Sequence, residues 1–346
     1  MSRRFAPLLV AMLCLQATDA FGGEWSPERA ASYLDRRLEQ WFAWKPAASA
    51  DGPCVSCHTG MTYLMARPLL RRRLGEPQPT PYERGLLDRL RASVGEKPES
   101  YLQGVEVIFA ALFLSEQDAR QPMSTATRRA FDQLWMLQAT DGPSKGSWAW
   151  LSVDLDPWEH AESAYFGAAL AALALGHAGQ AYADGRTVAP HASALTAYLR
   201  APPSARRPQH DTLASLWASS RRRDLLLEPE RRALVADVLS KQQPDGGWTL
   251  SSIGPWAAHP QKPPVSGSSS YATGYVTYVL QRAGVGHSEP RLARALSWLA
   301  SRQDRDTGAW PEVSMNKRYP AGSMESFFMQ DAATAFASMA LIEAGH

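Results

Sequence analysis

One short motif occurs three times in the chain: a glutamine, a turn that contains glycine, and a tryptophan two residues after that glycine. The copies are Gln138-ATDGPSKGS-Trp148, Gln243-PDGG-Trp248 and Gln303-DRDTGA-Trp310. Each copy follows a stretch in which apolar residues recur at three- and four-residue spacing, which indicates a helix with one buried face. An internal repeat limits the possible folds more than composition does, because repeated units stack on one another.

A second kind of helix is expected after each tryptophan. These stretches are AYFGAALAALALGHAG, YATGYVTYVLQRAG and DAATAFASMALIEAG. They are rich in small residues and apolar on nearly every side, which is typical of a buried helix. Their closing glycines, Gly179, Gly284 and Gly345, stand where a helix end favours a left-handed residue. The repeat unit is therefore an outer amphipathic helix followed by an inner helix of small residues.

The rest of the chain follows the same alternation. Outer helices are expected at 26–44, 81–93 and 190–200, and inner helices at 54–70, 101–114 and 210–220. Strand signals are scarce. The sequence therefore predicts an all-α fold in which about six outer/inner helix pairs close a ring, an α/α toroid, around a central cavity. We expect a single domain over residues 21–346.

The three glutamine–tryptophan elements resemble the QW repeats of squalene–hopene cyclases and related terpenoid cyclases. Similar repeats occur in the prenyltransferase and squalene oxidase repeat family. The resemblance covers the chain from about Glu28 to the C-terminus. It implies the toroid fold, but the reaction has to be argued from the site residues, since one fold supports many reactions.

The cyclase resemblance also implies an aspartate-rich acid motif of the form DxDDTA. The nearest match, 330–335, keeps Asp331 and the following Thr-Ala but lacks the paired carboxylates. An isolated aspartate is expected to ionise, because no neighbouring carboxylate raises its pKa. Acid-initiated cyclisation is therefore not favoured, and Asp331 is the candidate catalytic residue only of a cyclase-like alternative. The Asp, Cys and His zinc ligands of the prenyltransferases have no counterparts here.

A different chemistry is indicated by Cys54-Val-Ser-Cys57-His58, at the start of the first expected inner helix. The CxxCH spacing is that of covalent haem c attachment. Two thiols two residues apart reach the two vinyl groups of one porphyrin, and the next histidine meets the iron. We therefore predict haem c, bound through Cys54 and Cys57, with His58 as an axial iron ligand.

Other readings of the same motif remain open. A Cys54–Cys57 disulfide is possible in an oxidising compartment. A thioredoxin-like redox pair lacks its βαβ context, and a metal clip has three ligands at most where about four are usual. Of the three cysteines in the chain, Cys14 lies in the expected leader, so only Cys54 and Cys57 remain.

Further site residues are predicted from the expected helices. If the inner helices run parallel, His160 or His210 lies near His58 and is a candidate sixth iron ligand. Four other side chains are expected to line the ring cavity: Glu162, Trp217, Tyr275 and Tyr278. Aromatic walls suit an apolar ligand, although they also fill cores.

The first 20 residues carry two early arginines, a short apolar run and small residues before position 21. This pattern predicts a signal peptide cleaved near Ala20, and hence a periplasmic or secreted protein. No later stretch is long and apolar enough to span a membrane. The formal net charge of +2 and the short arginine clusters argue against a nucleic-acid binder.

Together these patterns predict an exported c-type haem protein on a cyclase-like toroid. Its expected role is electron transfer with a redox partner protein, or haem-dependent oxidation of an apolar small molecule in the ring. The alternative is a haem-free lipid- or isoprenoid-binding or cyclase-like protein with a Cys54–Cys57 disulfide.

Overall fold

The computed structural model describes residues 25–49, 52–94, 103–119, 121–202, 204, 206–256, 261 and 266–346. Within these ranges the chain is almost entirely helical, with one short hairpin, β1 (Ala48–Ser49) and β2 (Gly52–Pro53). The all-α prediction is confirmed. The α-helices are α1 Pro27–Ala43, α2 Gly60–Arg73, α3 Pro81–Ser93, α4 Gln103–Gln117, α5 Thr125–Met136, α6 Ala164–Ala178, α7 Gln180–Ala183, α8 Ala189–Arg200, α9 Gln209–Ser219, α10 Glu228–Ser240, α11 Ser270–Arg282, α12 Pro290–Ala300 and α13 Phe328–Glu343.

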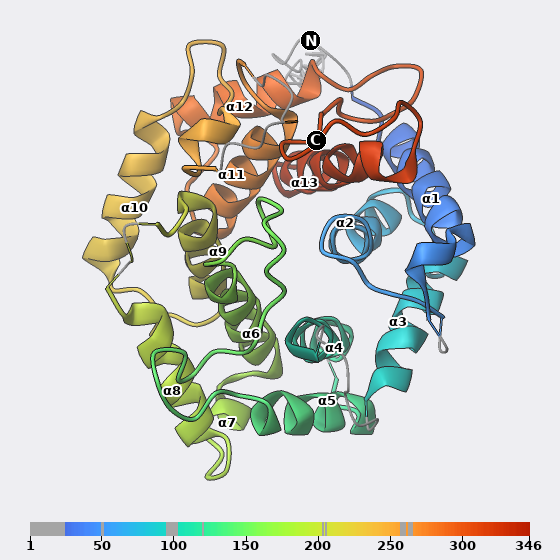
Figure 1. Ribbon diagram of the computed structural model, residues 1–346. Helices are drawn as coiled ribbons and strands as arrows, with labels where there is room; N and C mark the ends of the chain where they lie inside the picture. The colour runs from blue at the N-terminus through green and yellow to red at the C-terminus, as the bar shows by residue number, and fades with distance from the viewer. Residues whose placement is uncertain are drawn as a thin grey trace, which may run out of the picture.

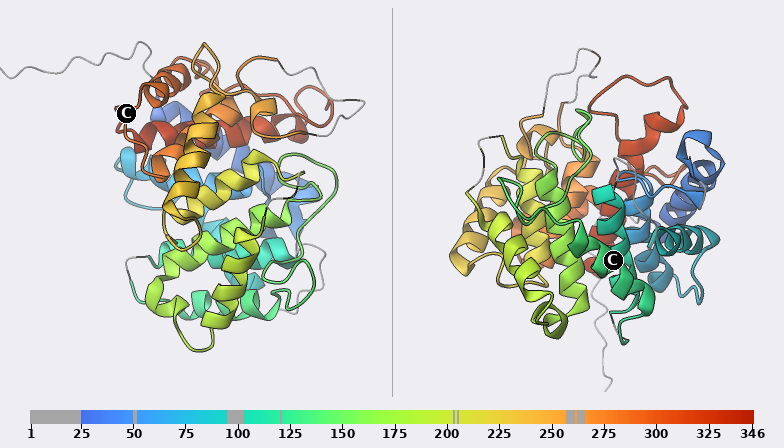
Figure 2. Two further views of the ribbon diagram at one scale, coloured as in Figure 1. Left: turned by 90° about the vertical axis from the view of Figure 1, so that its left-hand side faces the viewer. Right: turned by 60° about the horizontal axis from the view of Figure 1, so that its bottom comes forward.

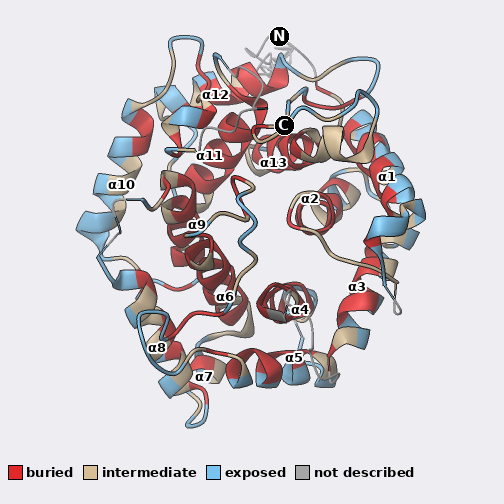
Figure 3. Ribbon diagram, in the orientation of Figure 1, coloured by how far each residue is buried: buried red, intermediate tan, exposed pale blue. Residues whose placement is uncertain are grey.

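The helices form two concentric rings, which is the predicted α/α toroid (Figure 1). The inner ring consists of α2, α4, α6, α9, α11 and α13, and the outer ring of α1, α3, α5, α8, α10 and α12. Inner helices are buried around most of their surface, whereas outer helices keep one exposed face (Figure 3). This division follows the sequence, because the small-residue stretches became inner helices and the amphipathic stretches became outer ones.

Small residues let the inner helices approach one another closely. In α11, a side-chain carbon added at Gly274 would lie 2.7 Å from the backbone nitrogen of Ala337 in α13. No side chain fits at that separation, so the contact between these two helices requires glycine. Close packing of this kind gives the dispersion contacts that make a buried interface favourable.

The tryptophans of the three repeats fasten each outer helix to the turn that follows it. The indole Nε1 of Trp148 donates to the carbonyl of Leu134 at 2.7 Å. Trp248 donates in the same way to Val238 at 2.9 Å, and Trp310 to Leu299 at 2.8 Å. All three indoles are buried, so each repeat satisfies one carbonyl near the end of its helix.

The glutamines join each turn to the start of the next outer helix. The Gln138 amide donates to the carbonyls of Gly146 and His191, both at 3.1 Å. In the second repeat the sequence assignment was wrong by one residue. Gln242 makes the equivalent bonds to Gly246 and Arg291, whereas the Gln243 amide donates to the nearby carbonyl of Lys241. Two adjacent glutamines cannot be told apart from spacing alone.

The inner helices run parallel, so the ring has two different mouths. First-turn residues of α9 and α11 meet at one end, where His210 bonds to Tyr271. Last-turn residues such as Arg72 of α2 and Glu343 of α13 line a common pocket at the other end. We call these ends the N-terminal and C-terminal mouths. In the left view of Figure 2, the green loop between α5 and α6 lies away from the chain's C-terminus.

Two further predictions concern the signal peptide and membrane-spanning helices. The expected signal peptide, residues 1–20, lies outside the described residues. Among the helices of the described ranges, none is long and apolar enough to cross a membrane.

Candidate functional site

The CxxCH motif lies at the N-terminal mouth, between the β1–β2 hairpin and α2. The Ser56 hydroxyl oxygen accepts the backbone N–H groups of Thr59 and Gly60, each at 3.1 Å, and so caps the start of α2. The Trp41 indole donates to the Cys54 carbonyl at 2.9 Å and ties the motif to α1. The backbone of the motif is therefore held at both ends.

His58 is oriented by a hydroxyl group and an aromatic ring. Its Nδ1 lies 2.9 Å from the Thr59 Oγ1, and the Thr59 hydroxyl in turn donates to the Asp331 carboxylate at 2.8 Å. Because the single Thr59 proton goes to Asp331, the Thr59 oxygen can accept from His58, and this contact favours a proton on Nδ1. The Ser56 hydroxyl lies farther from the same nitrogen, at 3.4 Å. The Nε2 lone pair is then available. The imidazole stacks on Phe328, with ring centroids 3.5 Å apart.

Asp331 anchors this arrangement at the start of α13. Its Oδ1 accepts from the Tyr33 hydroxyl and from Arg37 Nε, both at 2.8 Å. Burial raises the pKa of Asp331, while the Arg37 guanidinium and the hydroxyl donors favour the ionised form. Because every donor points at the carboxylate oxygens, the arrangement holds an anion rather than a carboxylic acid. The structure thus places the predicted Asp331 next to His58 as a positioning group.

The two cysteines of the motif are unbonded thiols. Burial raises the pKa of Cys54 to about 11 and that of Cys57 well above its ordinary value. Redox-active CxxC pairs depend on a lowered thiol pKa. The pKa values of these two thiols are raised instead, which does not favour a redox-active pair. Among the described residues, no three His, Cys, Asp or Glu side chains converge as ligands of a metal ion would.

The two predicted sixth-ligand histidines reach the same mouth but face a shared carboxylate. His210 Nδ1 lies 2.8 Å from Asp211, and its Nε2 lies 2.8 Å from the Tyr271 hydroxyl. His160 Nε2 lies 3.3 Å from the other Asp211 oxygen, while its Nδ1 accepts the Glu162 backbone N–H at 3.2 Å. Both nitrogens of His210 are hydrogen-bonded, whereas the buried His160 Nε2 faces Asp211 without a hydrogen bond.

Aromatic rings link this histidine pair to the CxxCH motif. The Trp158 ring lies 6.5 Å from the His58 ring and 5.4 Å from the Tyr271 ring. Trp158 belongs to the loop between α5 and α6, which reaches over the ring in Figure 1. The next residue, Glu159, is half-buried, and burial raises its pKa to about 7.

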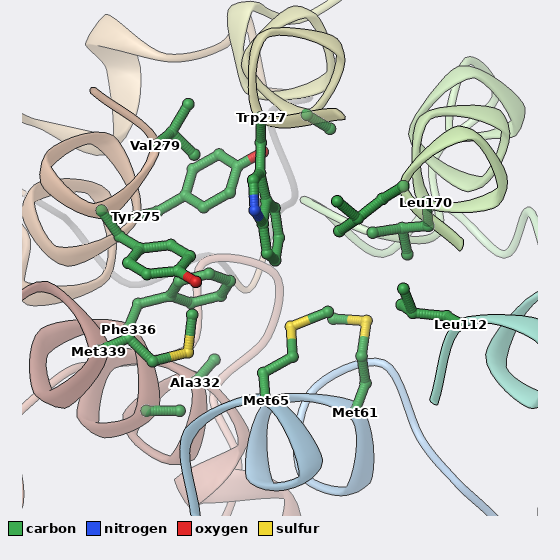
Figure 4. Packing of buried hydrophobic residues seen from close by; sticks show 14 of the residues in the cluster. Met61, Met65, Leu112, Leu170, Trp217, Tyr275, Val279, Ala332, Phe336 and Met339 are labelled. Carbon is green, nitrogen blue, oxygen red and sulfur yellow. The ribbon is translucent and has the colours of Figure 1, made fainter. Parts of the chain in front are cut away.

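The four predicted cavity residues divide into two groups. Trp217 and Tyr278 line a pocket of the ring. Tyr275 is buried nearby, and Figure 4 shows it with Trp217. The Tyr275 hydroxyl points to the N-terminal mouth and donates to the His210 carbonyl at 3.0 Å. Glu162 lies elsewhere, since its carboxylate accepts from the exposed Ser204 hydroxyl.

Comparison with known proteins gives one sequence relative and many structural ones. No protein-family model matches the chain. A squalene–hopene cyclase of Bradyrhizobium diazoefficiens is 32% identical over 111 residues. The likeness is local. It covers 32% of this chain and 15% of the cyclase, so the chain corresponds to a small part of that relative's length.

Solved structures of similar shape cover nearly the whole chain. A polysaccharide lyase superposes with a TM-score of 0.58 and 13% identity, covering 92% of this chain and 96% of its own. A possible family GH105 member from Salmonella enterica serovar Paratyphi A has a TM-score of 0.56 and 12% identity, and the match covers 98% of both chains. A family 88 glycosyl hydrolase from Bacteroides vulgatus has a TM-score of 0.55 and 13% identity, and the match covers 92% of this chain and 99% of the hydrolase. At these identities the likeness shows the α/α toroid fold alone.

Sequence reasoning missed the residues that orient His58. Thr59 directly follows the motif, and the structure shows it as the bridge between His58 and Asp331. Arg37 and Phe328 come from helices far away in sequence. The one available signal was the Asp331 carboxylate on an otherwise apolar stretch, because a buried charge needs a partner.

Proposed function

We propose that this chain is an exported c-type haem protein, acting in electron transfer or in the oxidation of an apolar small molecule. Cys54 and Cys57 would hold the haem through thioether bonds, and His58 would ligate its iron. The observation that carries the proposal is the His58–Thr59–Asp331 chain, because it leaves the imidazole Nε2 lone pair facing away from its hydrogen-bond partner. The expected signal peptide agrees, since haem c is attached outside the cytoplasm.

The donor set fits such a haem. Two unbonded thiols are separated by two residues, and the Thr59 hydroxyl oxygen favours a proton on Nδ1 of the following imidazole. A hydrogen bond to the distal ring nitrogen of a ligating histidine fixes the ring and makes the ligand more basic. Here Thr59 is that partner, and Asp331, held by Arg37, strengthens it electrostatically.

The neighbouring residues have separate tasks in this proposal. When bound, the haem supplies one-electron chemistry at the N-terminal mouth. Phe328 stacks on one face of His58 and Trp41 packs edge-on at 5.4 Å, so these rings keep water from the imidazole. The raised thiol pKa values keep Cys54 and Cys57 protonated and inert until they are modified. The apolar ring interior below is suited to an apolar substrate.

The test is a reduced pyridine haemochrome spectrum of the full chain, exported in a host with haem c maturation. We expect a c-type band in the wild type that is absent from the Cys54→Ala/Cys57→Ala double variant. His58→Ala should keep the thioether-type band but lose the native axial ligation, which shows in the visible spectrum of the untreated protein.

A colourless protein with an intact Cys54–Cys57 bridge would contradict the proposal and favour the haem-free ligand-binding alternative. Squalene turnover by the wild type, lost in an Asp331→Asn variant that is shown to be folded, would instead support the cyclase-like alternative. Mass spectrometry under non-reducing conditions separates the bridged from the haem-bearing form in the same sample.

A further inference from the structure

The C-terminal mouth of the ring contains a second site, on the opposite side from the CxxCH motif. A pocket of about 140 Å³ lies there and is lined by side chains from all six inner helices. Near its rim, each inner helix contributes one ionisable residue from its last turn or just beyond it: Arg72, Glu116, His177, Arg221, Arg282 and Glu343.

The deeper part of this pocket is apolar. Met65, Leu112 and Trp217 line it and point toward the middle of the ring in Figure 4. Its volume is close to that of an engineered apolar cavity of about 150 Å³ that binds benzene. The whole pocket, with its apolar floor and charged rim, is therefore about large enough for one aromatic ring.

The rim has more cationic donors than acceptors. Arg282 pairs with Glu343 at 2.8 Å. Glu116 interacts electrostatically with Arg72, Arg221 and Arg282, but no ion pair joins Arg72 or Arg221 to a carboxylate among the described residues. The Arg282 Nε and the His177 Nδ1 are buried and lack a hydrogen-bond partner in the described part of the chain. A buried donor without an acceptor is unfavourable, so the Arg282 Nε suits a ligand that supplies acceptor oxygens.

Helix dipoles explain part of this charge but not all of it. Six helix C-termini meet at this mouth, and arginines near them offset the partial negative charge of the last carbonyls. That effect accounts for cations at the rim. It does not supply an acceptor to the Arg282 Nε, and it does not account for an apolar pocket that opens between the arginines.

We propose that the C-terminal mouth binds a small apolar monocarboxylate, with its carboxylate at Arg72, Arg221 and Arg282 and its apolar part against Met65 and Trp217. The proposal goes beyond haem attachment and does not depend on it, because the site is built from residues at the other end of the inner helices. It can be measured in the haem-free Cys54→Ala/Cys57→Ala protein, so the two proposals fail separately.

The test is calorimetric titration of the full chain with benzoate, benzyl alcohol and benzylamine. We expect benzoate to bind and the neutral and cationic analogues to bind at least about tenfold more weakly, because charged hydrogen bonds are worth about one such factor or more. Arg221→Gln and Arg72→Gln should each weaken benzoate binding by about the same factor. Arg223→Gln is the matched control, since this neighbouring exposed arginine does not line the pocket.

Three results with the aromatic ligands would overturn the proposal. They are no heat with benzoate, equal affinity for benzyl alcohol, and benzoate binding that the Arg72 and Arg221 substitutions leave unchanged. Inorganic phosphate that binds as tightly as benzoate would also contradict it, because the apolar floor would then contribute nothing. Thermal unfolding of each variant shows that it is folded; both arginines are exposed, so neither substitution disturbs the core.

Discussion

Gln303 donates its side-chain amide to the carbonyl of Ser26 at 2.9 Å, although 277 residues separate the two positions. The Ser26 backbone N–H returns a hydrogen bond to the same side chain. Gln303 follows the last outer helix, α12, and Ser26 is the N-cap of the first, α1. The third repeat therefore closes the outer ring by the contact that the first two repeats make between successive helices.

Substitution of the bridging glutamines should lower stability, and the second repeat offers a matched pair. Gln242→Ala removes bonds to the carbonyls of Gly246 and Arg291, whereas Gln243→Ala removes only a local bond to Lys241. We expect Gln242→Ala to lower the free energy of unfolding by about 1–2 kcal/mol and Gln243→Ala by less than about 0.5 kcal/mol. Urea unfolding measures both. Equal losses would contradict the reassignment of the repeat.

The glycine of the third repeat should tolerate no side chain. Gly308 has φ +83°, and an added side-chain carbon would lie 2.3 Å from the Arg29 carbonyl oxygen of α1. Gly322 has a similar φ of +79° but nothing within 4 Å, so Gly322→Ala is the control for backbone strain alone. We expect Gly308→Ala to cost at least about 1–3 kcal/mol more than Gly322→Ala in unfolding experiments. Equal costs would show that α1 can move away from the turn.

The repeats explain why the fold was predictable, and their limits explain what was not. The Gly-x-Trp spacing and the small-residue helices are local features, so they can be recognised in a single sequence. The surroundings of His58 cannot be recognised in this way, because Arg37, Phe328 and Asp331 meet only when the ring closes. The C-terminal mouth was missed for the same reason: its ionisable residues are spread over six helices.

Removing the Asp331 charge should destabilise the protein strongly. Arg37 and Asp331 are both almost fully buried, so Asp331→Asn leaves a buried guanidinium without its counter-ion. We expect a loss of about 3–5 kcal/mol in the free energy of unfolding. Asp35→Asn is the control, because Asp35 is partly exposed and its partner Arg67 keeps a second ion pair with Glu76. A loss at Asp331 no larger than that at Asp35 would contradict the anchoring role.

Thr59 should set the proton position on His58. In the haem-free Cys54→Ala/Cys57→Ala protein, nitrogen NMR should show the neutral His58 protonated on Nδ1. Thr59→Val removes the hydroxyl that accepts this proton and should shift the population toward Nε2–H. Thr62→Val is the control, since the Thr62 hydroxyl donates only to backbone carbonyls, that of His58 at 2.6 Å. An Nε2–H form in the wild type would contradict the proposal that the His58 Nε2 lone pair is available to ligate iron.

Benzoate binding at the C-terminal mouth should weaken as the pH rises through about 7. Desolvation of the Glu116 carboxylate raises its pKa to about 7, while Arg72, Arg221 and Arg282 oppose this shift. The Glu116 side chain is exposed at the rim, which limits the size of the shift. Below that pH Glu116 is neutral, and above it a negative charge faces the bound carboxylate. Of the other rim groups, Glu343 is ion-paired with Arg282, and burial lowers the pKa of His177 to about 4. Benzoate itself remains ionised above about pH 6.

Glu116→Gln isolates this effect. The variant should bind benzoate at pH 8 more tightly than the wild type does, and its affinity should change little between pH 6 and 8. Calorimetric titration at several pH values measures both proteins, with Arg223→Gln retaining the wild-type pH profile. A wild-type affinity that rises with pH would reverse the expected sign, because it would mean that the ionised Glu116 helps rather than opposes the bound anion. A flat wild-type profile would place the Glu116 carboxylate too far from the ligand to act on it.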